Sequence, residues 1–180
     1  MKELVQDREL SLKSFDLGDN RILVEGALTD NRFRIKDHEP PTDSKLIHYM
    51  IVKLIVRGPE MLIETAEAEM PQHPREQCPV VLPWIKRLEG LNVVGGFTMK
   101  VKETIGNENG CSHLTSLVIS MGPAAVQGYW AAYGVERQKM RLKETAVKNI
   151  VNTCYLWREN GPLVAGLREA EKAGSEADIT

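Results

Sequence analysis

The sequence predicts an α+β domain in which a three-stranded antiparallel sheet is followed by helices packed on one of its faces. Two observations carry this prediction. The first half of the chain holds three segments in which apolar and polar residues alternate, and the second half holds apolar residues at helical spacing. Its 180 residues are enough for one domain with a core of its own. We expect that domain over residues 20–165, after an N-terminal arm (1–19) and before a polar tail (166–180).

Three segments show the alternation of half-buried strands, namely residues 21–30, 46–57 and 61–68. Gly58-Pro59 separates the last two in the manner of a hairpin, whereas residues 31–45 hold few apolar groups and form an expected long exposed loop. The even-numbered face of the first two strands requires a cover of helices, because it is apolar at most positions. Its residues are Ile22, Val24, Leu28, His48, Met50, Val52, Leu54 and Val56.

The helical cover is predicted from apolar residues three and four positions apart. The segments are residues 81–88, 97–105 and 111–133, and Pro123 either kinks the last one or starts another helix. Residues 136–148 carry five basic against two acidic side chains, which indicates a solvated linker or helix face.

Charge and hydropathy narrow the classes of partner. The chain has 23 basic and 25 acidic side chains and a pI near 6.1, so it lacks the general attraction that a nucleic-acid or acidic-membrane binder needs. The charged N-terminus does not suit a signal peptide, and no apolar run reaches membrane-spanning length. We therefore expect a soluble cytoplasmic protein that binds a protein or a small molecule, not a nucleic acid or a membrane.

The sharpest local motif is Cys111-Ser112-His113, at the expected start of a helix. Unpaired backbone N–H groups and the helix dipole favour a thiolate there, which makes the sulfur both a better nucleophile and a better metal ligand. Two residues this close cannot share a helical face, so if both bind one ion, at least one must precede the helix. The alternative is that Cys111 is a small buried side chain and His113 a surface residue.

Further ligands would have to come from elsewhere in the chain. Cys78 and Cys154 are the natural candidates, because three cysteines in a reducing compartment do not indicate disulfides and zinc takes three or four Cys and His ligands. Asp30 and His48 are secondary candidates. Asp30 is also explained as a turn residue, and His48 as a hydrogen-bonded core histidine. No phosphate loop, nucleophile elbow or His-Glu-x-x-His helix is present in the sequence.

Several ordered motifs mark the chain: Gly26-x-Leu28-x-Asp30, Ile47-His48-x-Met50, Cys78-Pro79, Leu88-x-Gly90-Leu91, Gly110-Cys111-Ser112-His113-Leu114 and Thr153-Cys154. They resemble a bacterial family known as domain of unknown function 2889, whose best marker is Gly-Cys-Ser/Thr-His-Leu. The resemblance runs from about residue 20 to residue 165. That family has no established activity, so the resemblance implies kinship and leaves the chemistry open.

The order of strands, helices and cysteines is also similar to the scaffold proteins on which iron–sulfur clusters are assembled. By that likeness Cys78 matches the thiol after the sheet, and Cys111-Ser112 matches a Cys-Ser at a helix start. The likeness implies a cluster or zinc held by cysteines beside an Asp or His. This chain lacks the scaffolds' Gly-Cys-Gly loop and their middle cysteine, and His113 follows its cysteine instead of preceding it.

Three functional hypotheses follow from these residues. The leading one is a zinc-binding or iron–sulfur protein in which Cys111 and His113 are ligands, together with Cys78 or Cys154. The second is a thiol-dependent enzyme or an acyl-binding protein, with Cys111 as the reactive thiol and His113 or His48 as its base. The third is a partner-binding module without a site, whose cysteines belong to the core.

Overall fold

The computed structural model describes residues 2, 4–33, 45–139, 151–166, 168 and 169. The chain divides into two compact units, Met1–Tyr129 and Trp130–Thr180. The first unit holds the sheet and the helical residues that cover it, as far as Tyr129. In the second unit, Cys154 is exposed. A helical turn follows it, in which the Ala165 N–H donates to the Gly161 carbonyl.

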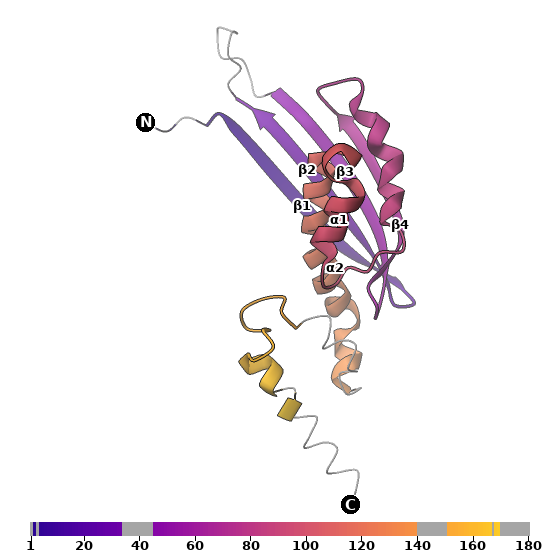
Figure 1. The fold of residues 1–180 in the computed structure, drawn as a ribbon, viewed down its shortest axis with the longest axis vertical. Coiled ribbons are helices and arrows are strands. Elements are labelled where there is room, and N and C mark those ends of the chain that lie inside the picture. Colours follow the sequence, from indigo (N-terminus) through magenta and orange to yellow (C-terminus); the bar gives the residue numbers. More distant parts are fainter. Residues whose placement is uncertain (1, 3, 34–44, 140–150, 167, 170–180) are drawn as a thin grey trace, which may run out of the picture. The chain divides into compact units, whose positions relative to one another are not determined.

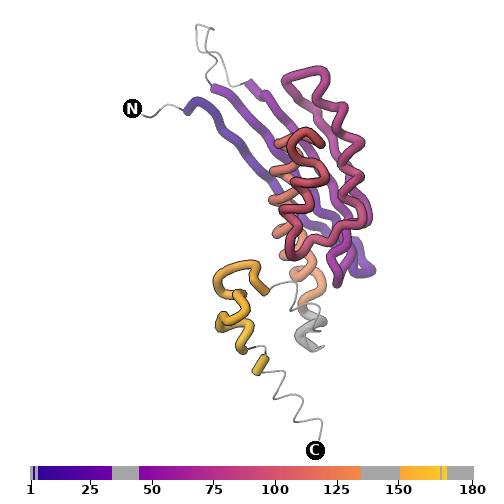
Figure 2. The backbone as a smooth tube through the Cα atoms, in the orientation of Figure 1, coloured from indigo at the N-terminus to yellow at the C-terminus, as the bar shows by residue number. Residues whose placement is uncertain are grey.

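The sheet is an antiparallel meander with strand order β1-β2-β3-β4, whose path Figure 2 follows along the backbone. The strands are β1 (Gln6–Gly18), β2 (Arg21–Arg32), β3 (Lys45–Arg57) and β4 (Leu62–Gln72), shown in Figure 1. The predicted α+β class with an antiparallel sheet is confirmed, and so is the β3–β4 hairpin at Gly58-Pro59. The sheet has four strands in the described part of the chain, however, and not three.

The additional strand is β1, which lies within the segment expected to be an N-terminal arm. It is an edge strand whose residues are exposed at most positions. Exposure on both faces removes the apolar alternation by which a half-buried strand is found, and charged residues are typical of such edges. The opposite edge is covered, because the segment after the next helix pairs with β4 through Ile63 N–H to the Leu91 carbonyl and Gly90 N–H to the Ile63 carbonyl.

The covering elements follow the sheet in sequence. They are the 3₁₀ helix η1 (Cys78–Leu88), α1 (Phe97–Ile105), the short 3₁₀ turn η2 (Asn107–Asn109) and α2 (Ser112–Lys139). The helix predicted over residues 97–105 is confirmed. The one predicted over 81–88 is a 3₁₀ helix with Pro83 inside it, and α2 continues through Pro123, so no new helix starts there.

The core lies between the even-numbered face of the sheet and these helices, as the alternation predicted. Val24, Val52 and Leu54 on the strands are fully buried, and so is Leu117 on α2. Gly26 lets the helix approach the sheet closely, because a Cβ there would lie 2.8 Å from Met121 Sδ and 3.0 Å from Leu117 Cδ1. The middle of the sheet therefore fixes where the first turns of α2 lie.

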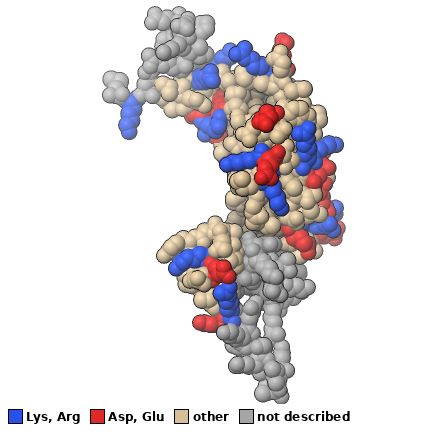
Figure 3. Space-filling model, viewed as in Figure 1, with Lys and Arg blue, Asp and Glu red and all other residues tan. Residues whose placement is uncertain are grey.

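Some sequence predictions fall outside the described residues. Residues 34–44 of the expected exposed loop, residues 140–148 of the basic stretch, and residues 167 and 170–180 of the expected tail are among them. Among the helices that the structure describes, none is long and apolar enough to cross a membrane. Basic and acidic side chains lie among one another on the surface of the first unit that Figure 3 shows.

Leu117→Ala tests this packing. Removing a fully buried leucine side chain between α2 and the sheet should lower the free energy of unfolding by about 2–5 kcal/mol. Leu10→Ala is the matched control, because Leu10 on β1 is 44% exposed and its loss should cost less than about 1 kcal/mol. Urea unfolding of both variants measures the difference. Equal midpoints for the two variants would contradict the assignment of Leu117 to the core.

Candidate functional site

One row of polar residues crosses three strands at one end of the sheet. In the antiparallel register Arg8 on β1 lies opposite Asp30 on β2, and Asp30 lies opposite His48 on β3. Side chains alternate along a strand, so these even-numbered residues share the face that the helices cover. Asp30 and His48 are the buried polar exceptions on an otherwise apolar face.

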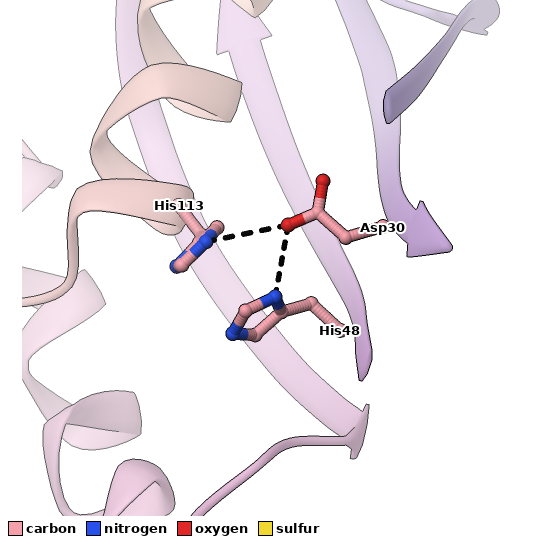
Figure 4. Close-up of side chains that lie close together, drawn as sticks. All are labelled: Asp30, His48 and His113. Atoms are coloured by element: carbon pink, nitrogen blue, oxygen red, sulfur yellow. Dashed lines mark hydrogen bonds and ion pairs between the residues drawn. The ribbon is translucent and has the colours of Figure 1, made fainter. Parts of the chain in front are cut away.

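A second histidine reaches this row from the first turn of α2. Hydrogen bonds connect the start of that helix to the end of α1. The Thr115 hydroxyl lies 2.8 Å from the Ile105 carbonyl oxygen and 2.9 Å from the Cys111 carbonyl oxygen. Gly110 lies against the Ile105 carbonyl, where a Cβ would clash with the backbone. These contacts place His113 over Asp30 and His48 (Figure 4). We call Arg8, Asp30, His48 and His113 the Asp30 cluster.

The Asp30 carboxylate is the centre of the cluster. Its Oδ1 accepts from Arg8 Nε at 2.6 Å, and its Oδ2 accepts from Arg8 Nη2 at 2.8 Å and from His48 Nδ1 at 2.8 Å. His113 Nε2 lies 3.4 Å from the same Oδ2. The two imidazole rings are themselves in contact, with centroids 3.8 Å apart and planes tilted by 32°. Two rings and a guanidinium therefore converge on one carboxylate.

Burial decreases from the carboxylate outwards. The side chain of Asp30 is 3% exposed, that of His48 11%, that of His113 22% and that of Arg8 40%. The hydrogen bond from Arg8 holds the pKa of Asp30 below its ordinary value, against the opposing effect of burial. Burial lowers the pKa of His113, helped by the positive charges of His48 and Arg8 and opposed by Asp30. The site thus favours an ionised carboxylate and a neutral His113, which are the protonation states that bind metal ions.

Three of these residues form a group that could hold a metal ion. Asp30, His48 and His113 each offer one ligand atom, and these atoms all lie within 4.8 Å of one another. We call them the His2Asp group. Two imidazoles and a carboxylate suit zinc or iron(II), and three protein ligands leave coordination positions open. An iron–sulfur cluster does not fit this donor set, because clusters are held by cysteine thiolates.

The structure brings together His113 and the two secondary candidates, Asp30 and His48. In the part of the chain that the structure describes, the group that could hold an ion contains none of the three cysteines. Cys78 begins η1, and Cys154 belongs to the second unit. Cys111 lies immediately before α2, with its Sγ 3.7 Å from His113 Nδ1. Cys111 therefore contacts the ring nitrogen that does not face Asp30.

Arg8 is the residue that sequence reasoning missed. It belongs to β1, which lies in the segment that the sequence predicts as an N-terminal arm, so no register connects it to the first predicted strand. The signal that could have found it is the spacing across the tight turn at residues 18–20. A hairpin closed there, with the one-residue register shift between Asp16 and Gly18, pairs position 8 with position 30.

The pH dependence of stability should reveal the Asp30 carboxylate. Because its folded-state pKa is depressed, its stabilisation is present above the ordinary aspartate value near 3.9 and is lost as the pH falls through the lower folded value. Asp30→Asn should therefore cost about 1–3 kcal/mol at pH 7, and less as the pH falls below about 4.

Urea unfolding in chelator at several pH values measures this effect. Asp16→Asn, on the exposed strand β1, is the control. A cost for Asp30→Asn that is the same at pH 7 and below pH 4 would contradict a depressed pKa.

Comparison with known proteins identifies the family. The family described as "Protein of unknown function (DUF2889)" matches residues 6–127, a range that includes all four strands and the whole Asp30 cluster but not Thr153-Cys154. No curated protein and no solved structure matches the chain, so the likeness to iron–sulfur scaffolds stays a prediction. Because the match covers more than half of the 180 residues, the chain belongs to the DUF2889 family, whose function is unknown.

Proposed function

We propose that this protein binds one divalent transition-metal ion, Zn²⁺ or Fe²⁺, through Asp30, His48 and His113. The observation that carries the proposal is the convergence of three ligand atoms within 4.8 Å of one another, on two neighbouring strands and a helix start. A site built on regular elements keeps its ligands in place, which is what metal binding requires.

The charges in the cluster support a role beyond structural pairing. Arg8 already neutralises Asp30 through two hydrogen bonds, one to each carboxylate oxygen. A second and a third nitrogen donor at Oδ2 are therefore not needed to offset the buried charge. Two imidazoles placed against a carboxylate are usual ligands of zinc and non-haem iron sites. The lowered pKa of His113 disfavours the doubly protonated ring, so a proton competes less with the ion for this side chain.

The partial exposure of the group favours a working site over a closed structural one. His113 is 22% exposed, and the ion would keep at least one position for water or another ligand. An ion in such a site acts as a Lewis acid and lowers the pKa of bound water. Cys111 would then contact Nδ1 of His113, the ring nitrogen that does not bind the ion. A contact at that nitrogen orients a metal-bound imidazole.

Removal of the ion should lower the melting temperature. Chelator-treated protein given Zn²⁺ at about 100 times its Kd should gain roughly 5–10 °C, because the ion binds the folded state alone. His48→Ala and His113→Ala should abolish this gain. His73→Ala is the matched control, since His73 is half-buried and, among the described contacts, bonds only the nearby Arg75 carbonyl.

Cys111→Ser separates the His2Asp group from the cysteine hypothesis. The serine variant should keep about one equivalent of zinc by elemental analysis and most of the thermal gain, because Sγ contacts the ring nitrogen away from Asp30. Loss of zinc from Cys111→Ser, with retention by His48→Ala, would overturn the proposed ligands. Absence of any zinc or iron binding by the unmodified protein would reject metal binding altogether.

A second candidate function is supported by one contact. Cys111 Sγ lies 3.7 Å from His113 Nδ1, and His113 Nε2 lies 3.4 Å from Asp30 Oδ2. This is the order of nucleophile, base and orienting carboxylate found in thiol enzymes. A metal-free protein with this relay would use Cys111 as a nucleophile.

Alkylation of metal-free protein tests the relay. Cys111 should react with iodoacetamide at pH 7 at least about tenfold faster than in His113→Gln, because the imidazole takes its proton. Exposed Cys154 serves as the internal reference thiol. A Cys111 that reacts more slowly than Cys154, at a rate unchanged in His113→Gln, would exclude the thiol function. Peptide mapping by mass spectrometry gives both rates in one experiment.

A further inference from the structure

We propose that Arg8 binds an oxyanion that also occupies an open position of the metal ion. The ligand class is a small molecule or group with at least two oxygens, a carboxylate or a sulfate-like or phosphate-like oxyanion. This inference rests on the proposed metal site and adds to it the class of the ligand. It follows from the position of Arg8, from the balance of charge and from the geometry of the guanidinium.

Arg8 forms a hydrogen bond with the Asp30 oxygen that a metal ion would need as a ligand. Its Nη2 lies 2.8 Å from Asp30 Oδ2, the same oxygen that both histidines approach. The side chain is 40% exposed and belongs to the edge strand β1, so it can leave the carboxylate without disturbing the core. Asp30 and His48, by contrast, are buried and held by the sheet.

Charge balance changes when an ion binds. Without the ion, Arg8 and Asp30 cancel and the histidines add no charge when neutral. A divalent ion leaves the cluster with two uncompensated positive charges, and it would lie close to the guanidinium because both bond Oδ2. The start of α2 adds the positive end of a helix dipole and has no acidic residue in its first turn. An anion between the ion and Arg8 removes this repulsion.

The neighbouring carboxylates do not supply that negative charge. Asp7 and Glu9 flank Arg8, but alternation along β1 directs them to the opposite face of the sheet. Asp7 is bonded there by the Asn31 amide. Within the described residues, no further Cys, His, Asp or Glu joins the His2Asp group. We therefore assign the compensating charge to an exogenous anion.

The guanidinium sets the shape of this ligand. Its Nε and Nη2 already hold two oxygens of a carboxylate, at 2.6 Å and 2.8 Å. The same planar fork can bind a free carboxylate, one oxygen of which also coordinates the ion, or a sulfate, which has further oxygens for the ion. Arg8 would thus exchange an internal carboxylate for an external one when the metal binds.

Titration with Co²⁺, followed by its absorption spectrum, tests the inference. The titrations are run in chloride, in acetate and in sulfate at one ionic strength, with chelator-treated protein. In the unmodified protein, acetate or sulfate should tighten Co²⁺ binding by about tenfold over chloride and change the spectrum. The acetate and sulfate arms distinguish the two kinds of oxyanion.

Arg8→Gln should still bind Co²⁺ but lose the effect of the anion, and in chloride it should bind at least as tightly as the unmodified protein. Arg8→Lys, which keeps the charge without the fork, should retain only part of the effect and guards against misfolding of the glutamine variant. Lys13→Gln, also on β1, should behave like the unmodified protein.

If acetate and sulfate do not tighten Co²⁺ binding, or tighten it equally in all these proteins, the proposed role of Arg8 is wrong. The proposed metal site would not be contradicted by that result. Absence of Co²⁺ binding in every salt would instead contradict the metal site and this inference together.

Discussion

The buried carboxylate of Asp30 is the constraint around which one end of this molecule is organised. An ionised carboxylate that is 3% exposed is costly unless partners surround it. Here every partner comes from a different element: Arg8 from β1, His48 from β3 and His113 from α2. The register of two hairpins and the start of a helix must all be correct for the charge to be satisfied. The cluster thereby links the fold of the first unit to its chemistry.

The same arrangement explains why the site lies at the end of the sheet and not at its middle. Over the middle, Gly26 allows α2 to touch the strands through Leu117 and Met121, which leaves an apolar, tightly packed core. One turn earlier the helix begins, so unpaired N–H groups, Cys111 and His113 gather where the polar row of the strands ends. Packing and polarity thus change over the length of one helical turn.

The elements that face the core on one side were predictable from sequence, because burial imposes a period. The alternation in β2 and β3 and the spacing in α1 gave both the strand faces and the helix over residues 97–105 correctly. β1 was missed because an exposed edge strand has no such period. Its omission hid Arg8, and with it the reason why Asp30 can be buried.

The site itself was half predictable. His113 was found through its cysteine neighbour, but the rule that soft thiolates bind zinc or iron most strongly directed attention to Cys78 and Cys154. Asp30 and His48 each had an adequate structural explanation when taken alone. The strand register places these two residues opposite each other, and α2 places His113 next to both. Only these two features of the fold distinguish a ligand group from two ordinary core residues.

The central claim is that an ion is held by nitrogen and oxygen and not by sulfur. X-ray absorption spectroscopy of the zinc-loaded protein tests it most directly, because the metal–ligand distances separate the two cases. The account predicts a shell of N and O atoms at about 2.0–2.2 Å with the outer-shell signature of two imidazoles, and no sulfur. A sulfur atom at about 2.3 Å from zinc would contradict it and would return Cys111 to the first coordination shell.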